Sequence, residues 1–420
     1  MNITENSKAA GSPVKEKLIY IGNKYLKPEI KQVFAGIPKA LTVKPLFNFK
    51  NRLNIFYFLN VFALLIFGLA MQYSASYENK DQLIFALLGM GLMLAVSGVN
   101  VKSYREISSF FMALSVGLLL LVLIFGTVHN GTKRWLWGFQ PSELGKTAFI
   151  MFLAYLIDKY KSKSNQVSTF WVFIAIIGFV GVLIIAEKHL SGLILYLCIG
   201  YAMMWYGGMN KKWFAIVTVI VVFAAIIVVW KPNILTYVPG IKDYMVERIV
   251  TWKKVILNQE LTYGEKIDEA HQVLQSLYGI GSGGVFGVGF GNSAQKVANL
   301  SEKSNDFIFA VIAEELGFVG AIILIALFGL LIWQGFKIAI KSKTYFGALV
   351  VMGISTQIAL QVLINIAVAT SLLPNTGISL PFFSSGGSSM LFTLFSMGVV
   401  LGISRDTNDN RIQRKDVENA

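Results

Sequence analysis

Residues 307–335 read FIFAVIAEELGFVGAIILIALFGLLIWQG, and this stretch decides the class of fold. Its only charged residues are Glu314 and Glu315. The stretch is longer than the roughly 20 apolar residues that cross a hydrocarbon core of about 30 Å as a helix. It therefore predicts a membrane-spanning helix, and the rest of the chain repeats the pattern.

The composition agrees with a membrane protein along the whole chain of 420 residues. Hydrophobic residues make up 55% and charged residues 14%, and the mean hydropathy of +0.61 is outside the range of a soluble globular domain. We expect an all-α, polytopic integral membrane protein with about ten transmembrane helices over residues 54–404, between tails at 1–53 and 405–420. The other apolar stretches lie at 54–76, 82–100, 108–128, 147–157, 168–186, 190–208, 213–230, 345–371 and 389–404.

Basic residues favour one side of this predicted membrane domain. The loops on the same predicted side as the two termini contain only Glu106 and Asp158 as acidic residues. Their basic residues are Lys102, Arg105, Lys159, Lys161, Lys163, Lys211, Lys212, Lys337, Lys341 and Lys343. The positive-inside rule therefore predicts that both termini are cytoplasmic. Most of the net charge of +14 then faces anionic lipids, so it does not indicate a nucleic-acid partner.

A long outer loop, residues 231–305, separates the seventh and eighth predicted helices. Most helix connections have only about 2–8 residues, and longer ones are usually functional. The second half of the loop contains the run GIGSGGVFGVGFG at 279–291, with no preceding strand that would support a phosphate-binding loop. The interleaved Val285, Phe286, Val288 and Phe290 call for burial, which favours a re-entrant or surface-hugging segment over a flexible linker.

Asp306 lies where this loop meets the apolar stretch at 307–335. A carboxylate at a membrane surface is costly, which marks Asp306 as a candidate functional residue. Glu314 and Glu315 follow about 12–14 Å further along the helix at 1.5 Å per residue. They are candidate cavity carboxylates, with a packing role as the alternative.

Two other polar groups lie on the same predicted outer side. The loop after the third helix carries Lys133, Arg134 and Lys146, against the positive-inside preference. Pairing with Glu143 is one explanation, and a clamp for a phosphorylated substrate is the other. The tenth helix opens with small residues whose N–H groups could bind an anion or simply be capped. These residues are Ser384, Ser385, Gly386, Gly387, Ser388 and Ser389.

Taken in order, these motifs resemble the SEDS family, which includes RodA, FtsW and SpoVE. The resemblance covers residues 54–404 and implies a ten-span peptidoglycan glycosyltransferase of the bacterial cytoplasmic membrane. Its substrate would be lipid II, a disaccharide-pentapeptide on undecaprenyl diphosphate, and its partners membrane lipids and a class B penicillin-binding protein. The matching residues are Lys133-Arg134-Trp135, Gln140-Pro141-Ser142-Glu143-Leu144 with Lys146, the glycine run, Gly291-Asn292-Ser293 with Gln295-Lys296, Asn305-Asp306-Phe307-Ile308-Phe309-Ala310, Glu314-Glu315-Leu316-Gly317 and Gly386-Gly387-Ser388-Ser389.

The resemblance also implies roles for individual residues. Asp306 matches the essential aspartate of the family and would be the general base for the attacking sugar hydroxyl. Arg134, with Lys133 and Lys146 as weaker candidates, would stabilise the departing diphosphate. An alternative role for Asp306 is to hold a divalent cation together with Glu302, about one turn earlier.

The sequence departs from the family pattern near several of these motifs. Lys188-His189 replaces a common Pro-Asp, Ser301 and Ser304-Asn305 alter the approach to Asp306, and Ser385 stands where tyrosine is common. These changes indicate a divergent paralogue of the elongation, division or sporulation branch. Two other functions stay open, a transporter that flips a lipid-linked precursor and a non-catalytic scaffold for the penicillin-binding protein.

Overall fold

The computed structural model describes residues 53–76, 80–129, 132–187, 189–237, 243–257, 267–298 and 304–408. Most of the two predicted tails lies outside these ranges, as does Glu302. Within them, a helix coincides with each of the ten predicted apolar stretches. These helices are α4 (Ile55–Ala75), α5 (Lys80–Ser97), α6 (Val101–Phe125), α7 (Pro141–Lys159), α8 (Val167–Ala186), α9 (Leu190–Tyr206), α10 (Lys211–Trp230), α14 (Ile308–Lys341), α15 (Tyr345–Ala369) and α16 (Gly387–Asn408).

Seven of the described helices are long and apolar enough to cross a membrane, namely α4, α6, α8, α10, α14, α15 and α16. Helices α5 and α9 are apolar but shorter. Helix α7 begins at Pro141, before the apolar stretch at 147–157, because the charged Glu143 and Lys146 in its first turns lie outside the apolar pattern. The structure confirms an all-α, polytopic membrane protein, whereas ten crossings stays a prediction.

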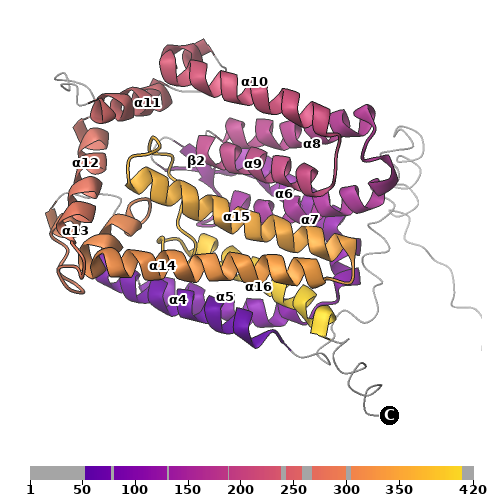
Figure 1. Ribbon diagram of the computed structural model, residues 1–420, viewed down its shortest axis with the longest axis horizontal. Helices are drawn as coiled ribbons and strands as arrows, with labels where there is room; N and C mark the ends of the chain where they lie inside the picture. The colour runs from indigo at the N-terminus through magenta and orange to yellow at the C-terminus, as the bar shows by residue number, and fades with distance from the viewer. Residues whose placement is uncertain are drawn as a thin grey trace, which may run out of the picture.

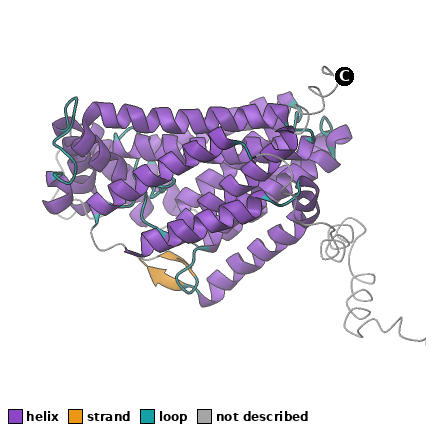
Figure 2. Ribbon diagram, turned by 90° about the horizontal axis from the view of Figure 1, so that it is seen from below, coloured by secondary structure: helices purple, strands orange, loops and turns teal. Residues whose placement is uncertain are grey.

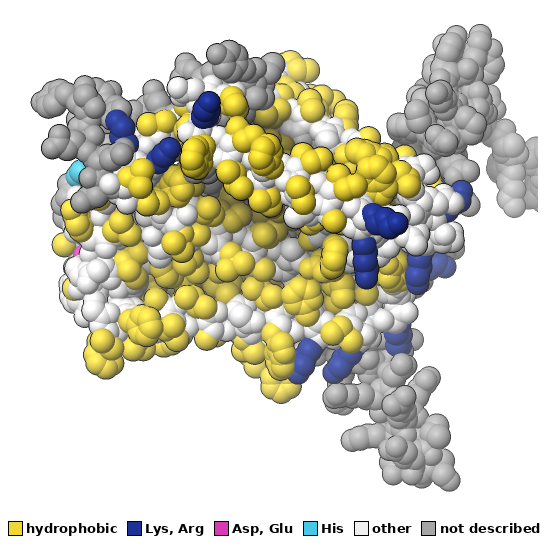
Figure 3. Space-filling model, turned by 45° about the horizontal axis from the view of Figure 1, so that its top comes forward, with side chains coloured by type: hydrophobic (Ala, Val, Ile, Leu, Met, Phe, Trp, Pro, Cys, Tyr) yellow, Lys and Arg dark blue, Asp and Glu magenta, His cyan; other side chains and the backbone are white. Residues whose placement is uncertain are grey.

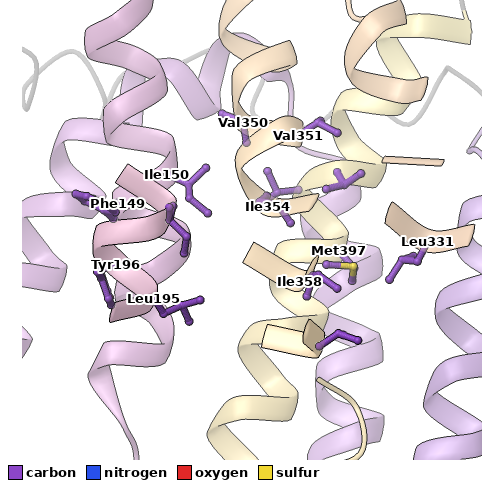
Figure 4. Close-up of a cluster of buried hydrophobic side chains, with 14 of the residues drawn as sticks. Phe149, Ile150, Leu195, Tyr196, Leu331, Val350, Val351, Ile354, Ile358 and Met397 are labelled. Carbon is purple, nitrogen blue, oxygen red and sulfur yellow. The ribbon is translucent and has the colours of Figure 1, made fainter. Parts of the chain in front are cut away.

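The helices run side by side along the long axis of the molecule (Figures 1 and 2). Helices α15 and α16 are mostly buried, while α10 lies at the edge and is almost wholly exposed. Apolar side chains from α7, α9, α14, α15 and α16 fill the centre of the bundle (Figure 4). Those labelled there include Phe149, Ile150, Leu195, Leu331, Val350, Ile354 and Met397.

An apolar belt surrounds this core. Figure 3 shows hydrophobic side chains over the middle of one face, with Lys and Arg confined toward its ends. Exposed members of the belt include Leu87, Val219, Phe223 and Phe318. Such a surface would cause association in water, whereas in a bilayer it is covered by lipid chains.

The polar site lies at one end of the bundle, here called the Asp306 end, where α4 and α15 finish and α7, α9 and α14 begin. A short antiparallel hairpin joins α6 to α7 at this end, formed by β1 (Thr127–His129) and β2 (Thr132–Trp135). Between α10 and α14 the chain forms η2 (Pro232–Tyr237), α11 (Asp243–Ile256), α12 (Ile267–Ser282) and α13 (Ala294–Ala298) (Figure 1). At the opposite end, η1 (Lys161–Lys163) joins α7 to α8.

Helix α14 is broken at Gly317, where φ is 67° and ψ is −166°. A break of this kind leaves carbonyl groups before it and N–H groups after it without helical partners. The glycine run supplies the missing partners through four backbone hydrogen bonds of 2.9–3.1 Å. Val288 and Gly289 donate to the carbonyls of Glu314 and Glu315, while Phe318 and Val319 donate to those of Gly284 and Val285.

Glycine is required on both sides of this contact. A Cβ atom on Gly287 would lie 2.1 Å from the carbonyl oxygen of Glu315, and one on Gly317 would lie 2.3 Å from the nitrogen of Gly287. The glycine run is therefore a backbone clamp on α14, because its glycines let the two backbones approach closely. Phe286 and its apolar neighbours do not pack inside the protein, so the re-entrant or surface-hugging segment stays a prediction.

Candidate functional site

The Asp306 end is organised around the turn at residues 304–307, which leads into α14. Three consecutive backbone carbonyls of this turn, those of residues 304–306, are each held by another segment. The Ser304 carbonyl accepts hydrogen bonds from the side chain of Gln72 in α4 at 2.8 Å and from the Ser385 N–H at 2.7 Å. The Asn305 carbonyl accepts from the Ser384 hydroxyl at 2.7 Å. The Asp306 carbonyl accepts from the side chain of Asn365 in α15 at 3.0 Å. The backbone that carries Asp306 is thus fixed by α4, α15 and the segment before α16.

The carboxylate of Asp306 is half-buried and lies beside Gly377. A Cβ atom on Gly377 would be 3.4 Å from Oδ2 of Asp306 and 3.9 Å from the hydroxyl oxygen of Ser191, so the two side chains flank the same glycine. Ser191, near the start of α9, donates its hydroxyl hydrogen to the carbonyl of Thr376. Because Gly377 has a φ of +70° and no side chain, it leaves space next to the carboxylate.

The two basic residues of β2 have different surroundings. Lys133 donates to the carbonyl oxygens of Leu123 and Ile124, at 2.8 and 2.9 Å, and so caps the end of α6. Arg134 is half-buried, and its buried Nε has no hydrogen-bond partner among the described residues. The structure therefore favours Arg134 over Lys133 as an anion-binding group.

Helix α7 presents a buried ion pair at the same end of the bundle. Lys146 Nζ lies 2.7 Å from Glu143 Oε2, and both side chains are nearly inaccessible to solvent. The alternative that basic residues of this loop pair with Glu143 is thus observed for Lys146. Tyr196 of α9 donates to the Ser142 carbonyl at 2.9 Å, which ties the start of α7 to α9.

Two site residues that sequence reasoning did not select lie in the turn between α8 and α9. Glu187 is fully buried, and burial raises the pKa of its carboxyl group from 4.5 to about 8, an effect that Arg134 partly offsets. Burial and the charges of Arg134 and Lys146 lower the pKa of His189 from 6.5 to about 3, so its imidazole is neutral. The departure at Lys188-His189 was the signal for this turn, but only the fold brings it beside Arg134.

The small residues before α16 serve mainly as internal connections. The Ser384 hydroxyl bridges the Leu380 N–H and the Asn305 carbonyl, and the Gly386 N–H donates to Gln82 at 3.2 Å. The Ser388 hydroxyl accepts the Gln140 N–H, the Ser389 hydroxyl lies 3.4 Å from that of Ser379, and Gly387 allows close contact with the Phe85 ring. These contacts are those of a structural cap. An anion site at 384–389 therefore stays a prediction.

Glu314 and Glu315 are not arranged as cavity carboxylates. Glu314 accepts the N–H groups of Ala294 and Gln295 and so caps the short helix α13. Glu315 accepts hydrogen bonds from Lys296 and from the Ser74 hydroxyl of α4. The packing alternative is therefore the one that the geometry favours, since both carboxylates anchor the long connection to the bundle.

A metal ion would need a group of suitable side chains near Asp306. Among the described residues, no three His, Cys, Asp or Glu side chains lie together in a way that could hold one. Glu302 lies outside the described ranges. The divalent-cation hypothesis stays a prediction, and no catalytic step below depends on it.

An all-helical bundle with an apolar belt and a polar group at one end defines a multi-pass membrane protein. The family described as cell cycle protein FtsW/RodA/SpoVE matches residues 53–409. The chain therefore belongs to this family, the SEDS proteins, and the resemblance noted in the sequence is confirmed.

Individual relatives match over most of their length. Stage V sporulation protein E of Bacillus subtilis is 35% identical over 361 residues, which are 81% of this chain and 94% of that protein. The probable peptidoglycan glycosyltransferase FtsW of Geobacter sulfurreducens is 33% identical over 373 residues, with 84% and 95% covered. SpoVE and FtsW relatives thus match at similar identity, which leaves the choice of paralogue open.

Solved structures show the same fold. The Thermus thermophilus rod shape determining protein RodA aligns with a TM-score of 0.61 at 23% identity, covering 84% of this chain and 97% of that one. A chain from a study of polymerization and crosslinking by a peptidoglycan synthase complex aligns with a TM-score of 0.69 at 24% identity, covering 84% and 98%. At these identities the likeness supports the helical fold alone.

Proposed function

We propose that this protein is a peptidoglycan glycosyltransferase that polymerises lipid II at the outer face of the bacterial cytoplasmic membrane. The observation that carries the proposal is the 33% identity over 95% of a protein named as a peptidoglycan glycosyltransferase. Because the match spans nearly the whole relative, it includes both Asp306 and Arg134 rather than one shared motif.

The proposed orientation follows from charge. Lys102, Lys161, Lys211 and Lys341 lie at or near the helix ends opposite to the Asp306 end. If that basic end is cytoplasmic, both termini are inside and the Asp306 end faces outward. A substrate held in the outer leaflet by its lipid then presents its diphosphate and sugars at the level of Asp306 and Arg134.

The reaction is a displacement at the anomeric carbon of one lipid-linked sugar by the 4-hydroxyl of another. Asp306 accepts the hydroxyl proton while the new C–O bond forms, and the bond from the anomeric carbon to the diphosphate oxygen breaks with inversion. The departing diphosphate takes the bonding electron pair. The bonds to Gln72, Ser384 and Asn365 hold the Asp306 turn in place, so little reorganisation is needed.

Arg134 stabilises the charge that develops on the diphosphate. A guanidinium can donate two parallel hydrogen bonds to phosphate oxygens, which suits this role better than an ammonium group. The buried Nε of Arg134 has no partner among the described residues and is the donor that the substrate would satisfy. Glu187 and His189, on which the charge of Arg134 acts, are followed by Ser191, whose side chain flanks Gly377 together with that of Asp306.

We also infer a transpeptidase partner, a class B penicillin-binding protein. One structure with the same fold is described as part of a complex that coordinates polymerization with crosslinking. Glycan strands made here would need such cross-linking by another enzyme. Which surface of this chain the partner contacts is a separate question from catalysis.

A lipid transporter is the alternative from another class, and the broken α14 is the observation in its favour. Transporter helices commonly break at the membrane midplane. Here residues 318–341 still form about 36 Å of helix at 1.5 Å per residue, enough to cross the hydrocarbon core. The break at Gly317 thus lies near the Asp306 end, which favours the enzyme.

The deciding experiment is polymerisation of purified lipid II by the reconstituted protein, with and without the transpeptidase partner. We expect glycan strands from the wild type and roughly 10²- to 10⁴-fold slower synthesis by Asp306→Ala, the usual cost of losing a general base. Lipid movement across the same liposomes without any glycan product would replace the enzyme with a transporter. Wild-type rates from Asp306→Ala would remove only its catalytic role.

A further inference from the structure

Glu187 is a buried carboxylate that the proposed reaction does not use. Its side chain is fully inaccessible to solvent, yet neither carboxylate oxygen has a hydrogen-bond partner among the described residues. Buried polar groups are nearly always satisfied, because an unpaired one costs the full desolvation of the group. We therefore expect the unpaired Glu187 carboxylate to gain and lose a partner during function.

The groups around Glu187 leave one candidate for that partner. Among the described residues, Arg134 of β2 and Tyr196 of α9 interact electrostatically with Glu187. Glu143 of α7 acts on Tyr196, and Lys146 of α7 acts on His189, the neighbour of Glu187 in the turn. Lys146 is already paired with Glu143, the Tyr196 hydroxyl donates to a backbone carbonyl, and His189 is neutral. Lys188 lies outside the described residues. Arg134, whose Nε is buried and lacks a described partner, is the cation that remains.

The turn that carries Glu187 also reaches the catalytic side of the site. Four residues after Glu187, the Ser191 hydroxyl is bonded to Thr376 and flanks Gly377 together with the Asp306 carboxylate. Glu187 therefore lies in the segment that joins the leaving-group side of the site to the general-base side. A change in its charge would therefore change the electrostatic potential where the diphosphate binds.

We propose that Glu187 is a positioning residue that controls Arg134: when ionised it holds the guanidinium as its own counter-ion, and when protonated it releases it to the diphosphate of the substrate. This inference rests on the proposed role of Arg134 in diphosphate binding. Where Glu187 is ionised in the free protein, binding of the substrate is then coupled to uptake of one proton by Glu187. The carboxylate and the diphosphate compete for the same cation. Arg134 therefore pairs either with the ionised carboxylate or with the diphosphate, but not with both.

The sign of the pH effect follows from the group that titrates. Burial raises the pKa of Glu187 to about 8, so the carboxyl is mostly neutral at pH 7 and mostly ionised at pH 9. If only the neutral form leaves Arg134 free, the apparent KM for lipid II rises about tenfold between these pH values. The effect should appear in KM and not in kcat, because the bound complex contains the protonated form.

The test compares KM for lipid II at pH 7 and pH 9 in three proteins. We expect the tenfold rise in the wild type, a change of no more than about twofold in Glu187→Gln, and a high KM that no longer depends on pH in Arg134→Ala. Asp158→Asn, at the opposite end of the bundle, should keep the wild-type profile. A wild-type slope in either Glu187→Gln or Arg134→Ala would overturn the proposal.

A direct binding measurement distinguishes this inference from the proposed function. It also tests the inference if the Glu187→Gln protein does not fold. The probe is undecaprenyl diphosphate, titrated into the reconstituted wild-type protein at pH 7 and pH 9. Binding about tenfold weaker at pH 9 supports the coupling. Equal binding at both pH values overturns the role of Glu187 while leaving the diphosphate site intact, and no binding at either pH overturns the diphosphate site itself.

Discussion

Lys296 Nζ lies 2.8 Å from Glu315 Oε1, and neither side chain is appreciably exposed. The same ammonium group donates to the carbonyl and hydroxyl oxygens of Ser74, at 3.0 Å each. One buried ion pair thus joins the long connection, α14 and the last turn of α4. Glu315 lies two residues before the break at Gly317, so α13 is fixed to α14 next to the backbone clamp.

Replacement of Glu315 by Gln should therefore destabilise the protein strongly. The substitution leaves the Lys296 ammonium buried without its counter-ion, which typically costs about 3–5 kcal/mol. The measurement is the apparent unfolding temperature in detergent. Asp158→Asn is the matched control, because its pair with Arg105 is partly exposed and such pairs contribute about 0–1 kcal/mol. Equal losses in the two variants would show that the Glu315 pair has no special structural role.

Gly317→Ala should open the clamp between α14 and the glycine run. Its Cβ would lie 2.3 Å from the Gly287 nitrogen and 2.5 Å from the Val285 carbonyl oxygen, in a backbone conformation that alanine rarely adopts. We expect a loss of more than about 2 kcal/mol and faster proteolysis of the loop at 283–291. Gly329→Ala, in the open helical part of α14, should change stability by no more than about 1 kcal/mol. A stable Gly317→Ala protein would contradict the clamp.

Arg134 and Lys133 are adjacent and should give different defects. Arg134→Ala removes the charge-assisted hydrogen bonds to the diphosphate, worth about 1.5–3 kcal/mol, so KM for lipid II at pH 7 should rise roughly 10- to 100-fold. Lys133→Ala removes the cap on α6 and should lower stability by about 1 kcal/mol, with a much smaller effect on KM. Steady-state kinetics and unfolding curves for both variants check this. The assignment fails if Lys133→Ala raises KM as much as Arg134→Ala does.

The pH dependence of stability should separate His189 from Glu187. The pKa of His189 is lowered from 6.5 to about 3, so between these values the unfolded chain binds more protons and stability falls as the pH drops, by about 2 kcal/mol from pH 6.5 to 5. The pKa of Glu187 is raised from 4.5 to about 8, so its stabilising contribution is present at low pH and is lost as the pH rises toward 8.

Two variants test these opposite signs. His189→Gln should remove part of the acid loss, whereas Glu187→Gln should remove part of the loss toward pH 8, as measured by unfolding temperatures from pH 5 to 8. The two curves should therefore tilt in opposite directions from the wild type. Parallel curves for all three proteins would mean that folding shifts the pKa of neither group in this window.

The helices were predictable from the sequence because lipid imposes a local rule. A segment in hydrocarbon must satisfy its own backbone and present apolar side chains, so each span can be recognised without its neighbours. The stretches at 168–186 and 345–371 accordingly match α8 and α15 closely. The apolar stretch at 147–157 covers only part of α7, because Glu143 and Lys146 interrupt the apolar pattern and form their ion pair only in the folded protein.

The sequence by itself thus determined the helical class and the family, and it singled out Asp306 as a candidate, since these depend on local composition and on ordered motifs. Only the tertiary structure decided which polar residues meet. It assigned Lys133 to the end of α6, Glu314 and Glu315 to anchoring, and Glu187 to the surroundings of Arg134. Such contacts join residues far apart in the chain through packing and desolvation, and no local pattern encodes them. The same holds for the three carbonyls that fix the Asp306 turn, because their donors come from α4, α15 and the segment before α16.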